Sequence, residues 1–250
     1  FLTISDKLGE KMALQTNGLI IPRGMVLPLR LYHINGGSLG AAGTIVKKLK
    51  EHPVEFKERK FYEGFSDVDT DGSMISVYYT IGQPITVQRM KDGEMETQVV
   101  YSQGRCEYII HTREKYLECR GTSWVTKKGL LPLMNLLGVE FDGINLSENA
   151  MVTLCRDAAM VKTVQISELD NPALSQIQLS GEILDSAEWT IYRRQGVIRY
   201  FRGYIDLDDA GQISAQITNK GSMLIYKRGV GIPAEDVIAA VSMIMKIAKN

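Results

Sequence analysis

The sequence lacks a net charge, a long apolar run and paired cysteines. Its 29 lysines and arginines equal its 29 aspartates and glutamates, so no overall positive field holds the chain on nucleic acid or on an anionic membrane. The apolar runs are shorter than the roughly 18 residues of a spanning helix, and no signal stretch opens the chain, so we expect a cytoplasmic protein without membrane insertion. The three cysteines, Cys106, Cys119 and Cys155, are odd in number and widely spaced, which predicts buried thiols rather than a disulfide framework.

Histidine is scarce as well. His33, His52 and His111 are the only histidines, and neither they nor the cysteines have the paired spacing of a zinc site. We therefore expect no metal and no cofactor. What is present is an ordinary globular mixture, 44% hydrophobic and 23% charged, in a chain of 250 residues that can form one large domain or two smaller ones.

Two segments of the chain are similar to each other. Residues 60–69, KFYEGFSDVD, match residues 199–208, RYFRGYIDLD, at a shift of about 139 residues, and the glycines that follow them, Gly72 and Gly211, keep the same shift. Similarity at a constant shift inside one chain predicts an internal duplication. The first unit would span residues 1–139 and the second unit residues 140–250.

Each of the matching segments predicts a β-hairpin, because aromatic and β-branched residues alternate on both arms of an Asp and Gly turn. The arms span 60–68 and 74–81 in the first unit, and 197–207 and 212–218 in the second. Further alternating segments of the first unit predict an antiparallel meander of separate strands. These strands are expected at 85–90, 95–102, 106–111 and 116–120, with turns at Asp92-Gly93, Gly104 and Arg113-Glu114.

Apolar residues recur at helical spacing in four places. Helices are expected at 38–52, at 130–137 with Pro132 shortening or kinking the helix, at 147–158, and after Pro233. The first helix conflicts with the repeat, because its counterpart at 176–184 has the pattern of a strand. Together these elements predict an α+β protein of two related, mostly antiparallel units, each combining a sheet with a helix.

A short motif, Gly36-Gly37-Ser38-Leu39-Gly40, satisfies the pattern G-x-S-x-G between a strand-like run and a helix-like run. It resembles the nucleophile elbow of serine hydrolases, in which a tight turn exposes the serine hydroxyl beside oxyanion donors. The resemblance implies Ser38 as nucleophile and His111 as base, with an orienting carboxylate from Asp67, Asp69 or Asp92. Two alternatives remain open: Ser38 caps the following helix, or the glycines form a phosphate loop of the dinucleotide-binding type.

The turn of the first hairpin, Asp67-Val68-Asp69-Thr70-Asp71-Gly72, has the opening pattern of an EF-hand calcium loop. The alternate carboxylates Asp67, Asp69 and Asp71 could ligate a hard cation. However, position twelve of the loop is Tyr78 instead of glutamate, and no helices are expected on either side. We therefore favour a hairpin turn in which the aspartates accept hydrogen bonds from nearby backbone amides.

Basic and aromatic residues interleave in both hairpins. Arginine and lysine can hold phosphate while aromatic rings stack on bases, so these strands predict a surface for single-stranded nucleic acid or a phosphorylated ligand. The alternative is a half-buried strand whose aromatic residues enter the core while its arginines face solvent. The candidate ligand-binding residues are Lys57, Arg59, Lys60, Tyr62, Arg193, Arg194, Arg199 and Arg202.

The repeated features are strands, turns and core positions rather than clusters of polar residues. The favoured function is therefore a non-enzymatic binding or assembly module that acts through a protein partner or through self-association. Binding of nucleic acid or a phosphorylated ligand is the first alternative, and a serine hydrolase built on Ser38 is the second. An assembly module should change its mass with concentration, whereas nucleic-acid binding should weaken with salt and a hydrolase should label covalently at Ser38.

Overall fold

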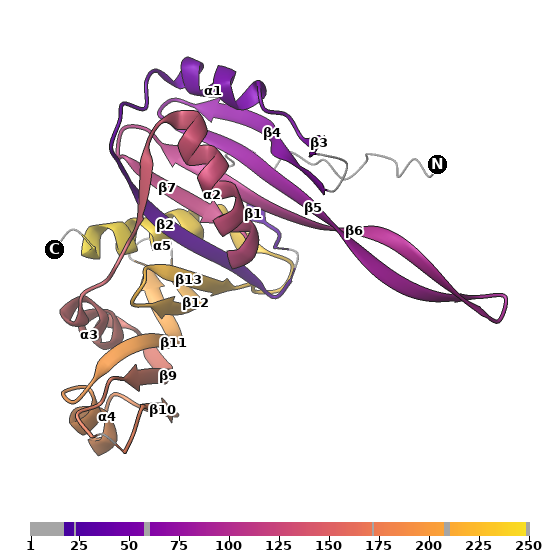
Figure 1. Ribbon diagram of the computed structural model, residues 1–250. Helices are drawn as coiled ribbons and strands as arrows, with labels where there is room; N and C mark the ends of the chain where they lie inside the picture. Colours follow the sequence, from indigo (N-terminus) through magenta and orange to yellow (C-terminus); the bar gives the residue numbers. More distant parts are fainter. Residues whose placement is uncertain (1–17, 23, 58–60, 172, 208–210, 249–250) are drawn as a thin grey trace.

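One continuous antiparallel sheet organises the molecule. The computed structural model describes residues 18–22, 24–57, 61–171, 173–207 and 211–248 (Figure 1). Within these ranges twelve strands form the sheet, and their pairings are antiparallel. The combination of helices with a mostly antiparallel sheet confirms the predicted α+β class.

The first half of the chain supplies the longest strands. β4 and β5 form the hairpin expected from their alternating aromatic and β-branched residues, and β6 and β7 continue it as a meander. The elements of this half are β1 (Leu19–Ile20), β2 (Val26–Asn35), α1 (Ala42–Lys50), β3 (Glu55–Lys57), β4 (Phe61–Asp71), β5 (Met74–Lys91), β6 (Glu94–His111), β7 (Tyr116–Arg120) and α2 (Ser123–Leu137).

The second half contains shorter strands and more helices. β11 and β12 form the second predicted hairpin, and β13 pairs with β12 as its third strand. The elements of this half are β8 (Glu140–Gly143), α3 (Glu148–Asp157), β9 (Met160–Ser167), β10 (Gln176–Ser180), α4 (Ala187–Tyr192), β11 (Val197–Leu207), β12 (Gly211–Thr218), β13 (Ser222–Tyr226), β14 (Ile232–Pro233) and α5 (Ala234–Ile247).

Strand β2 lies in the middle of the sheet and joins the two halves. The strand order is β10-β9-β11-β12-β13-β2-β7-β6-β5-β4-β3, and β8 pairs with the end of β2 beyond β13. β2 comes from the first predicted unit, yet one of its edges is bonded to β13 of the second. The two predicted units therefore share one sheet.

The helices cover opposite faces of the two halves of the sheet. α1 and α2 pack on one face of the first half, and α3, α4 and α5 pack on the other face of the second half (Figure 1). We call these the α2 face and the α5 face. Alternate residues of β2 enter both cores, because successive side chains of a strand point to opposite faces: Leu29 and Leu31 join the core under α5, and Ile34 joins the core under α2.

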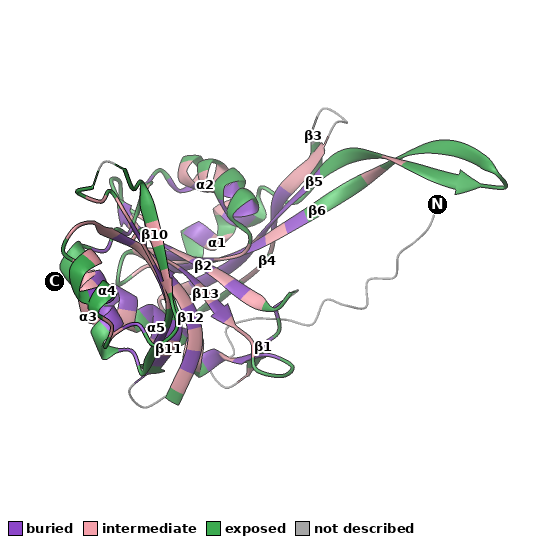
Figure 2. Cartoon of the chain, turned by 90° about the horizontal axis from the view of Figure 1, so that it is seen from below, coloured by how far each residue is buried: buried purple, intermediate pink, exposed green. Residues whose placement is uncertain are grey.

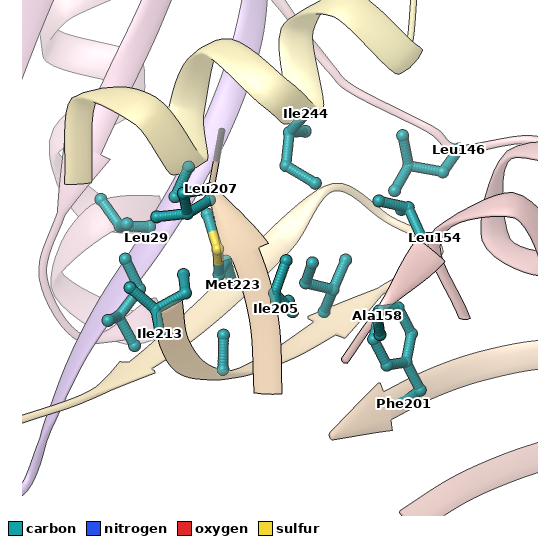
Figure 3. Close-up of a cluster of buried hydrophobic side chains, with 14 of the residues drawn as sticks. Leu29, Leu146, Leu154, Ala158, Phe201, Ile205, Leu207, Ile213, Met223 and Ile244 are labelled. Atoms are coloured by element: carbon teal, nitrogen blue, oxygen red, sulfur yellow. The ribbon is translucent and has the colours of Figure 1, made fainter. Parts of the chain in front are cut away.

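The larger core lies between α5 and the second half of the sheet. Figure 3 shows Ile244 of α5 above Ile205 and Met223, which come from β11 and β13. Buried positions alternate along β11, β12 and β13, so one face of each strand is in the core and the other is not. Each large apolar side chain in this core contributes about 1.5–3 kcal/mol relative to leaving it exposed.

The predicted meander of separate short strands is wrong in its middle. β5 and β6 are uninterrupted strands of 18 residues each, paired in one register from Met74 with His111 to Lys91 with Glu94. Gly104 is not in a turn. Its lack of a side chain instead allows the close approach of Trp124 and Val125 of α2, which a Cβ atom would contact at 2.6 and 2.4 Å. The predicted turns at Asp92-Gly93 and Arg113-Glu114 are confirmed.

The predicted helices are present, but some of their boundaries differ from the prediction. α1 begins at Ala42 rather than at Ser38, and α2 continues through Pro132 to a left-handed C-cap at Gly138. The helix at 147–158 is confirmed as α3, whose N-cap Ser147 accepts a hydrogen bond from the backbone N–H of Ala150. No helix in the described ranges is long and apolar enough to cross a bilayer.

The two halves differ in strand order. In the first half, β2 precedes the hairpin in the chain and pairs with β7, which is the last strand of the meander. In the second half, β9 precedes the hairpin in the chain and pairs with β11, which is the first strand of that hairpin. The segment opposite the first helix in the repeat forms strand β10, as its pattern predicted, and the short helix α4 follows it. The internal duplication therefore remains a prediction.

Candidate functional site

A long hairpin projects from the edge of the body. Residues 83–91 of β5 and 94–102 of β6 pair only with each other within the described chain, and we call residues 83–102 the arm. Nine residue pairs at about 3.4 Å per residue give it a length of roughly 30 Å. Figure 2 shows the arm extending from the body and exposed along most of its length.

The two faces of the arm differ in charge. Residues directly opposite each other in an antiparallel pair share a face. One face has no charged residue and consists of the pairs Pro84–Tyr101, Thr86–Val99, Gln88–Thr97 and Met90–Met95. The other face carries, toward the tip, the pairs Arg89–Glu96 and Lys91–Glu94. We call the first the charge-free face; it continues from the α5 face of the sheet.

Large apolar side chains stand in solvent along the charge-free face. The exposed fraction is 69% for Met90, 58% for Met95, 59% for Val99 and 40% for Tyr101. Single exposed apolar residues are normal on a protein surface, whereas a row of them along one strand face is typical of interaction surfaces.

Three aromatic rings support the base of the charge-free face. Phe56, Tyr62 and Tyr101 meet with ring centroids 5.6–5.7 Å apart. The ring of Tyr62 lies over Gly82, where a Cβ atom would be 2.1 Å from two ring carbons. Glycine at this position is required for the close approach, and the ring covers backbone that glycine leaves bare.

The charged face of the arm places cations opposite carboxylates. Lys91 Nζ lies 3.7 Å from Glu96 Oε1, and the two cations of β5 stand opposite the two glutamates of β6. The part of this face toward the tip is therefore suited to solvent, while nearer the body the same face carries Ile85, which is 45% exposed. A two-stranded hairpin with neither face packed is marginally stable alone, and its outer edges present unpaired backbone groups. The charge-free face is the side on which a partner would stabilise the arm.

Ser38 lies exposed in the loop between β2 and α1. It does not cap α1, whose N-cap is Ala41 without a side-chain hydrogen bond, so the cap interpretation is wrong. Gly36, Gly37 and Gly40 have positive φ angles, which explains the glycines by backbone conformation. No hydrogen bond or ion pair in the described chain links Ser38 to His111. Asp92, one candidate orienter, is at the tip of the arm.

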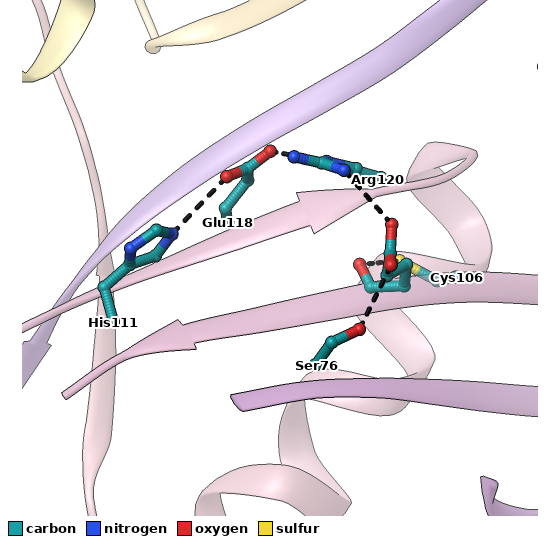
Figure 4. Close-up of polar contacts among 6 residues, drawn as sticks. Ser76, Cys106, His111, Glu118 and Arg120 are labelled. Carbon is teal, nitrogen blue, oxygen red and sulfur yellow. Dashed lines mark hydrogen bonds and ion pairs between the residues drawn. The ribbon is translucent and has the colours of Figure 1, made fainter. Parts of the chain in front are cut away.

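His111 belongs instead to a buried charged cluster on the α5 face of the first half (Figure 4). Its Nε2 lies 3.5 Å from Glu118 Oε2, and its ring stacks on Tyr116 with centroids 3.9 Å apart. Glu118 accepts a hydrogen bond from Arg120 Nε at 2.6 Å, and Glu107 Oε2 lies 3.5 Å from Arg120 Nη1.

The two carboxylates of this cluster have opposite pKa shifts. Burial raises the pKa of Glu107 more than Arg120 and the Ser76 hydroxyl lower it. For Glu118 burial also acts upward, but Arg120 and His111 together outweigh it and the pKa is lowered. Opposed shifts in one cluster are typical both of acid–base sites and of structural ion networks. Glu107 and Glu118 are only 3% exposed, which favours the structural role.

The spacing of the charged residues in the sequence carries a signal for this cluster. Glu107 and His111 on β6, and Glu118 and Arg120 on β7, are spaced by even numbers of residues, so each pair shares a face of its strand. Charged residues at alternate positions of otherwise apolar strands predict a polar row across the sheet. Which residues of the two strands pair with one another was not fixed by that pattern.

The aspartates of the first hairpin do not converge on one point. Asp67 forms an ion pair with Arg105. Asp69 accepts a hydrogen bond from the backbone N–H of Thr70, and Asp71 pairs with Met74 at the turn. The hairpin is confirmed, but among the described contacts only Asp69 of the three aspartates accepts a hydrogen bond from a nearby backbone amide. Among the described residues no group of three or more His, Cys, Asp or Glu side chains is placed to hold a metal ion.

Those candidate ligand-binding residues that the structure describes are spread over both faces and both halves of the sheet. Tyr62 faces the α5 side of the first half, whereas Arg202 faces the α2 side of the second half. Arg199 is bonded to Ser167 and Glu168, and Arg193 follows α4 with its guanidinium 6.0 Å from the ring of Trp189. The remaining positions are Arg194, exposed in the turn after α4, Lys57 at the end of β3, and Arg59 and Lys60, which lie outside the described residues.

The three cysteines are free and buried, as predicted. Burial raises the pKa of Cys106 and of Cys155 to about 12, so both thiols stay protonated at neutral pH. Neither has the thiolate character of a catalytic nucleophile.

Comparisons with known proteins give no family. No protein-family description matches this sequence, and a search of curated proteins returns no match. Any function assigned to the chain therefore rests on its own geometry.

Proposed function

We propose that the protein is a non-enzymatic assembly module that self-associates through the charge-free face of its arm. The single observation that carries this proposal is the row of exposed apolar side chains on one face of a hairpin that belongs to neither core of the described chain. Covering Met90, Met95 and Val99 removes apolar surface from water and adds packing that a lone hairpin lacks.

The size of the surface suits a protein partner. The exposed parts of Phe56, Met90, Met95, Val99 and Tyr101 amount to an area on the order of several hundred Å², before the intervening polar residues are counted. A standard interface buries roughly 800 Å² on each partner. The arm and its aromatic base are therefore close to what one stable interface needs.

A second copy of the chain is the occupant that the chemistry favours. A twofold-symmetric dimer places the same patch on both sides of the contact, so the patch must be compatible with itself. The charge-free face meets this condition, since no like charges are opposed when two arms pack face to face. The opposite face, which carries Arg89, Lys91, Glu94 and Glu96, would stay in solvent.

We also infer that the two units at 1–139 and 140–250 arose by duplication, in a reducing cytoplasmic compartment. The corresponding hairpins β4–β5 and β11–β12, and the helices α2 and α5 late in each unit, support the duplication. The three free cysteines support the compartment.

The test is the mass of the protein by light scattering and native mass spectrometry at two concentrations. We expect an oligomer that dissociates on dilution, and we expect Val99→Lys to give the 27.9 kDa monomer. The matched control is Gln98→Lys, which adds the same charge one residue away on the opposite face and should assemble like the wild type. A wild type that remains monomeric at the highest concentration, or a Val99→Lys variant that still assembles, contradicts the proposal.

A further inference from the structure

On the α2 face of the second half no helix of the described residues packs against the sheet. α3, α4 and α5 bury the other face of β9 and β11–β13. The residues of these strands that point to the α2 face are half-buried or exposed. We call this surface the open face. The cross-strand pairings place its side chains in two rows, Gln178–Gln165–Tyr200–Thr218–Ser222–Arg30 and Ser180–Thr163–Arg202–Gln216–Leu224–Pro28.

The open face carries a local positive charge. Lys162, Arg202 and Arg30 contribute cations from β9, β11 and β2. Among the outward residues of the described strands β9 to β13, Asp206 at the end of β11 is the only carboxylate. Within the described chain, Lys162 and Arg202 have no ion-pair partner. A neutral protein therefore presents a positive surface at one place.

Tyrosine rings fix the positions of two of these cations. Lys162 Nζ lies 4.2 Å from the ring centroid of Tyr204 and donates a hydrogen bond to its hydroxyl at 3.0 Å. The guanidinium of Arg202 lies 4.3 Å from the ring centroid of Tyr226. The hydrogen bond from Lys162 lowers the pKa of the Tyr204 hydroxyl, and the charges of Lys162, Arg228 and Arg202 act in the same direction.

Between the cations lie side chains that can hydrogen-bond or stack. Gln165 donates to Gln176 at 2.9 Å, and the Tyr200 hydroxyl donates to Gln178 at 3.1 Å. Amides of this kind carry both donors and acceptors and can bond the edges of bases. A planar guanidinium held over a ring also offers a flat surface on which a base can stack.

We propose that the open face binds single-stranded nucleic acid, with Lys162, Arg202 and Arg30 holding phosphates and with the tyrosine and glutamine side chains meeting the bases. The chemistry is that of sheet surfaces that combine cations with aromatic rings. Four inter-strand spacings of about 4.8 Å separate β9 from β2, so the surface spans roughly 19 Å, enough for several nucleotides. This proposal is independent of self-association, because the arm belongs to the other half of the sheet.

Single strands fit this face better than the other polyanions. Among the described elements of the open face no helix or ribbon projects to enter the major groove of a duplex, and the arm belongs to the other half of the sheet. An acidic protein segment could use the cations but would leave the stacked Arg202–Tyr226 and Lys162–Tyr204 pairs without a function. A single strand would use both features, because its phosphates bind the cations and its unstacked bases contact the cation–ring pairs.

The test is fluorescence anisotropy of the intact protein with a labelled oligothymidine of about 12 nucleotides over a series of salt concentrations. Three phosphate contacts predict that the logarithm of the binding constant falls with the logarithm of salt at a slope of about −2. The double variant Lys162→Ala/Arg202→Ala should bind at least about tenfold more weakly, with a slope smaller in magnitude by about 1.4. Arg194→Ala removes one positive charge from the turn after α4, away from the open face, and should bind like the wild type, as should Val99→Lys.

Circular dichroism and thermal melting establish that each variant is folded. A second variant, Tyr226→Leu, tests the ring that lies under Arg202. It keeps both cations and an apolar side chain, so it should lose affinity without changing the salt slope. Failure of the wild type to bind at low salt, equal loss in Arg194→Ala, or unchanged binding in the double variant would overturn the proposal. Equal competition by duplex DNA, heparin or polyglutamate would overturn the assignment to single strands.

Discussion

At the scale of the residue, Glu107 and Glu118 make opposite contributions to stability within one cluster. Glu118 has a lowered pKa, so its contribution is present above its ordinary value of 4.5 and is lost as pH falls through the folded pKa. Glu107 has a raised pKa, so its contribution is full below 4.5 and is lost as pH rises through its folded pKa.

We therefore expect Glu118→Gln to lower the free energy of unfolding at pH 7 by about 3 kcal/mol, because it leaves Arg120 and His111 without their shared carboxylate. Glu107→Gln should change it by less than about 1 kcal/mol, because burial makes the ionised form of this carboxylate unfavourable in the fold. Urea denaturation at pH 7 and at pH 5 measures both variants. Equal destabilisation by the two substitutions would mean that the cluster acts as one ion network in which the sign of each shift is irrelevant.

Two glycines in helices offer a second comparison at this scale. Gly129 of α2 lies against Tyr108 and Tyr79, and a Cβ atom there would be 2.3 Å from the Tyr108 hydroxyl oxygen. We expect Gly129→Ala to destabilise the protein by about 1–3 kcal/mol through overpacking. A Cβ atom added at Gly43 of α1 would meet no atom within 4 Å, so Gly43→Ala should stabilise the protein by up to about 1 kcal/mol through helix propensity. Thermal melts of the two variants should shift in opposite directions.

At the scale of the element, the arm is separable from the body. Its residues beyond the aromatic base belong to neither hydrophobic core. Replacing residues 85–100 by an Asn-Gly turn should therefore leave the free energy of unfolding of the monomer within about 1 kcal/mol of the wild type, measured at concentrations where the protein is dissociated. The same replacement should abolish assembly. A loss of several kcal/mol would show that the arm supports the body.

The elements differ in how far their sequence determines them. The hairpins, the helix α3 with its Ser147 cap and the C-terminal helix were predictable, because alternation, caps and turn residues are local signals. The strands of the arm at 85–90 and 95–102 and its turn at Asp92-Gly93 were predictable in the same way, but their continuity with the strands of the body was not, since Gly104 has the pattern of a turn while its reason is the packing of Trp124 on another element. The separation of Tyr62 from Arg202 onto opposite faces was likewise not predictable, because it depends on strand order and on which face each set of helices covers.

At the scale of the whole molecule, the shared strand β2 should make the two halves differ in stability when they are separated. A fragment of residues 140–250 lacks β2, so β13 loses its neighbour and the core under α5 loses Leu27, Leu29 and Leu31. We expect this fragment to show no cooperative unfolding transition by circular dichroism. A fragment of residues 1–139 keeps β2 with β7 and most of its own core, and it should retain a transition. Mixing the two should restore structure to the second, and a cooperative transition in the isolated 140–250 fragment would contradict this expectation.

The central place of β2 also has a consequence for synthesis on the ribosome. β2 is complete at Asn35, but its neighbour β13 ends only at Tyr226, which is 191 residues later by subtraction. At 5–20 residues per second this interval lasts roughly 10–40 s. During that time the inner edge of the future sheet is open to any other strand, including the same edge of a neighbouring nascent chain. Chains that terminate before β13 would keep that edge permanently, so truncated products should depend on chaperones or aggregate even where the finished protein does not.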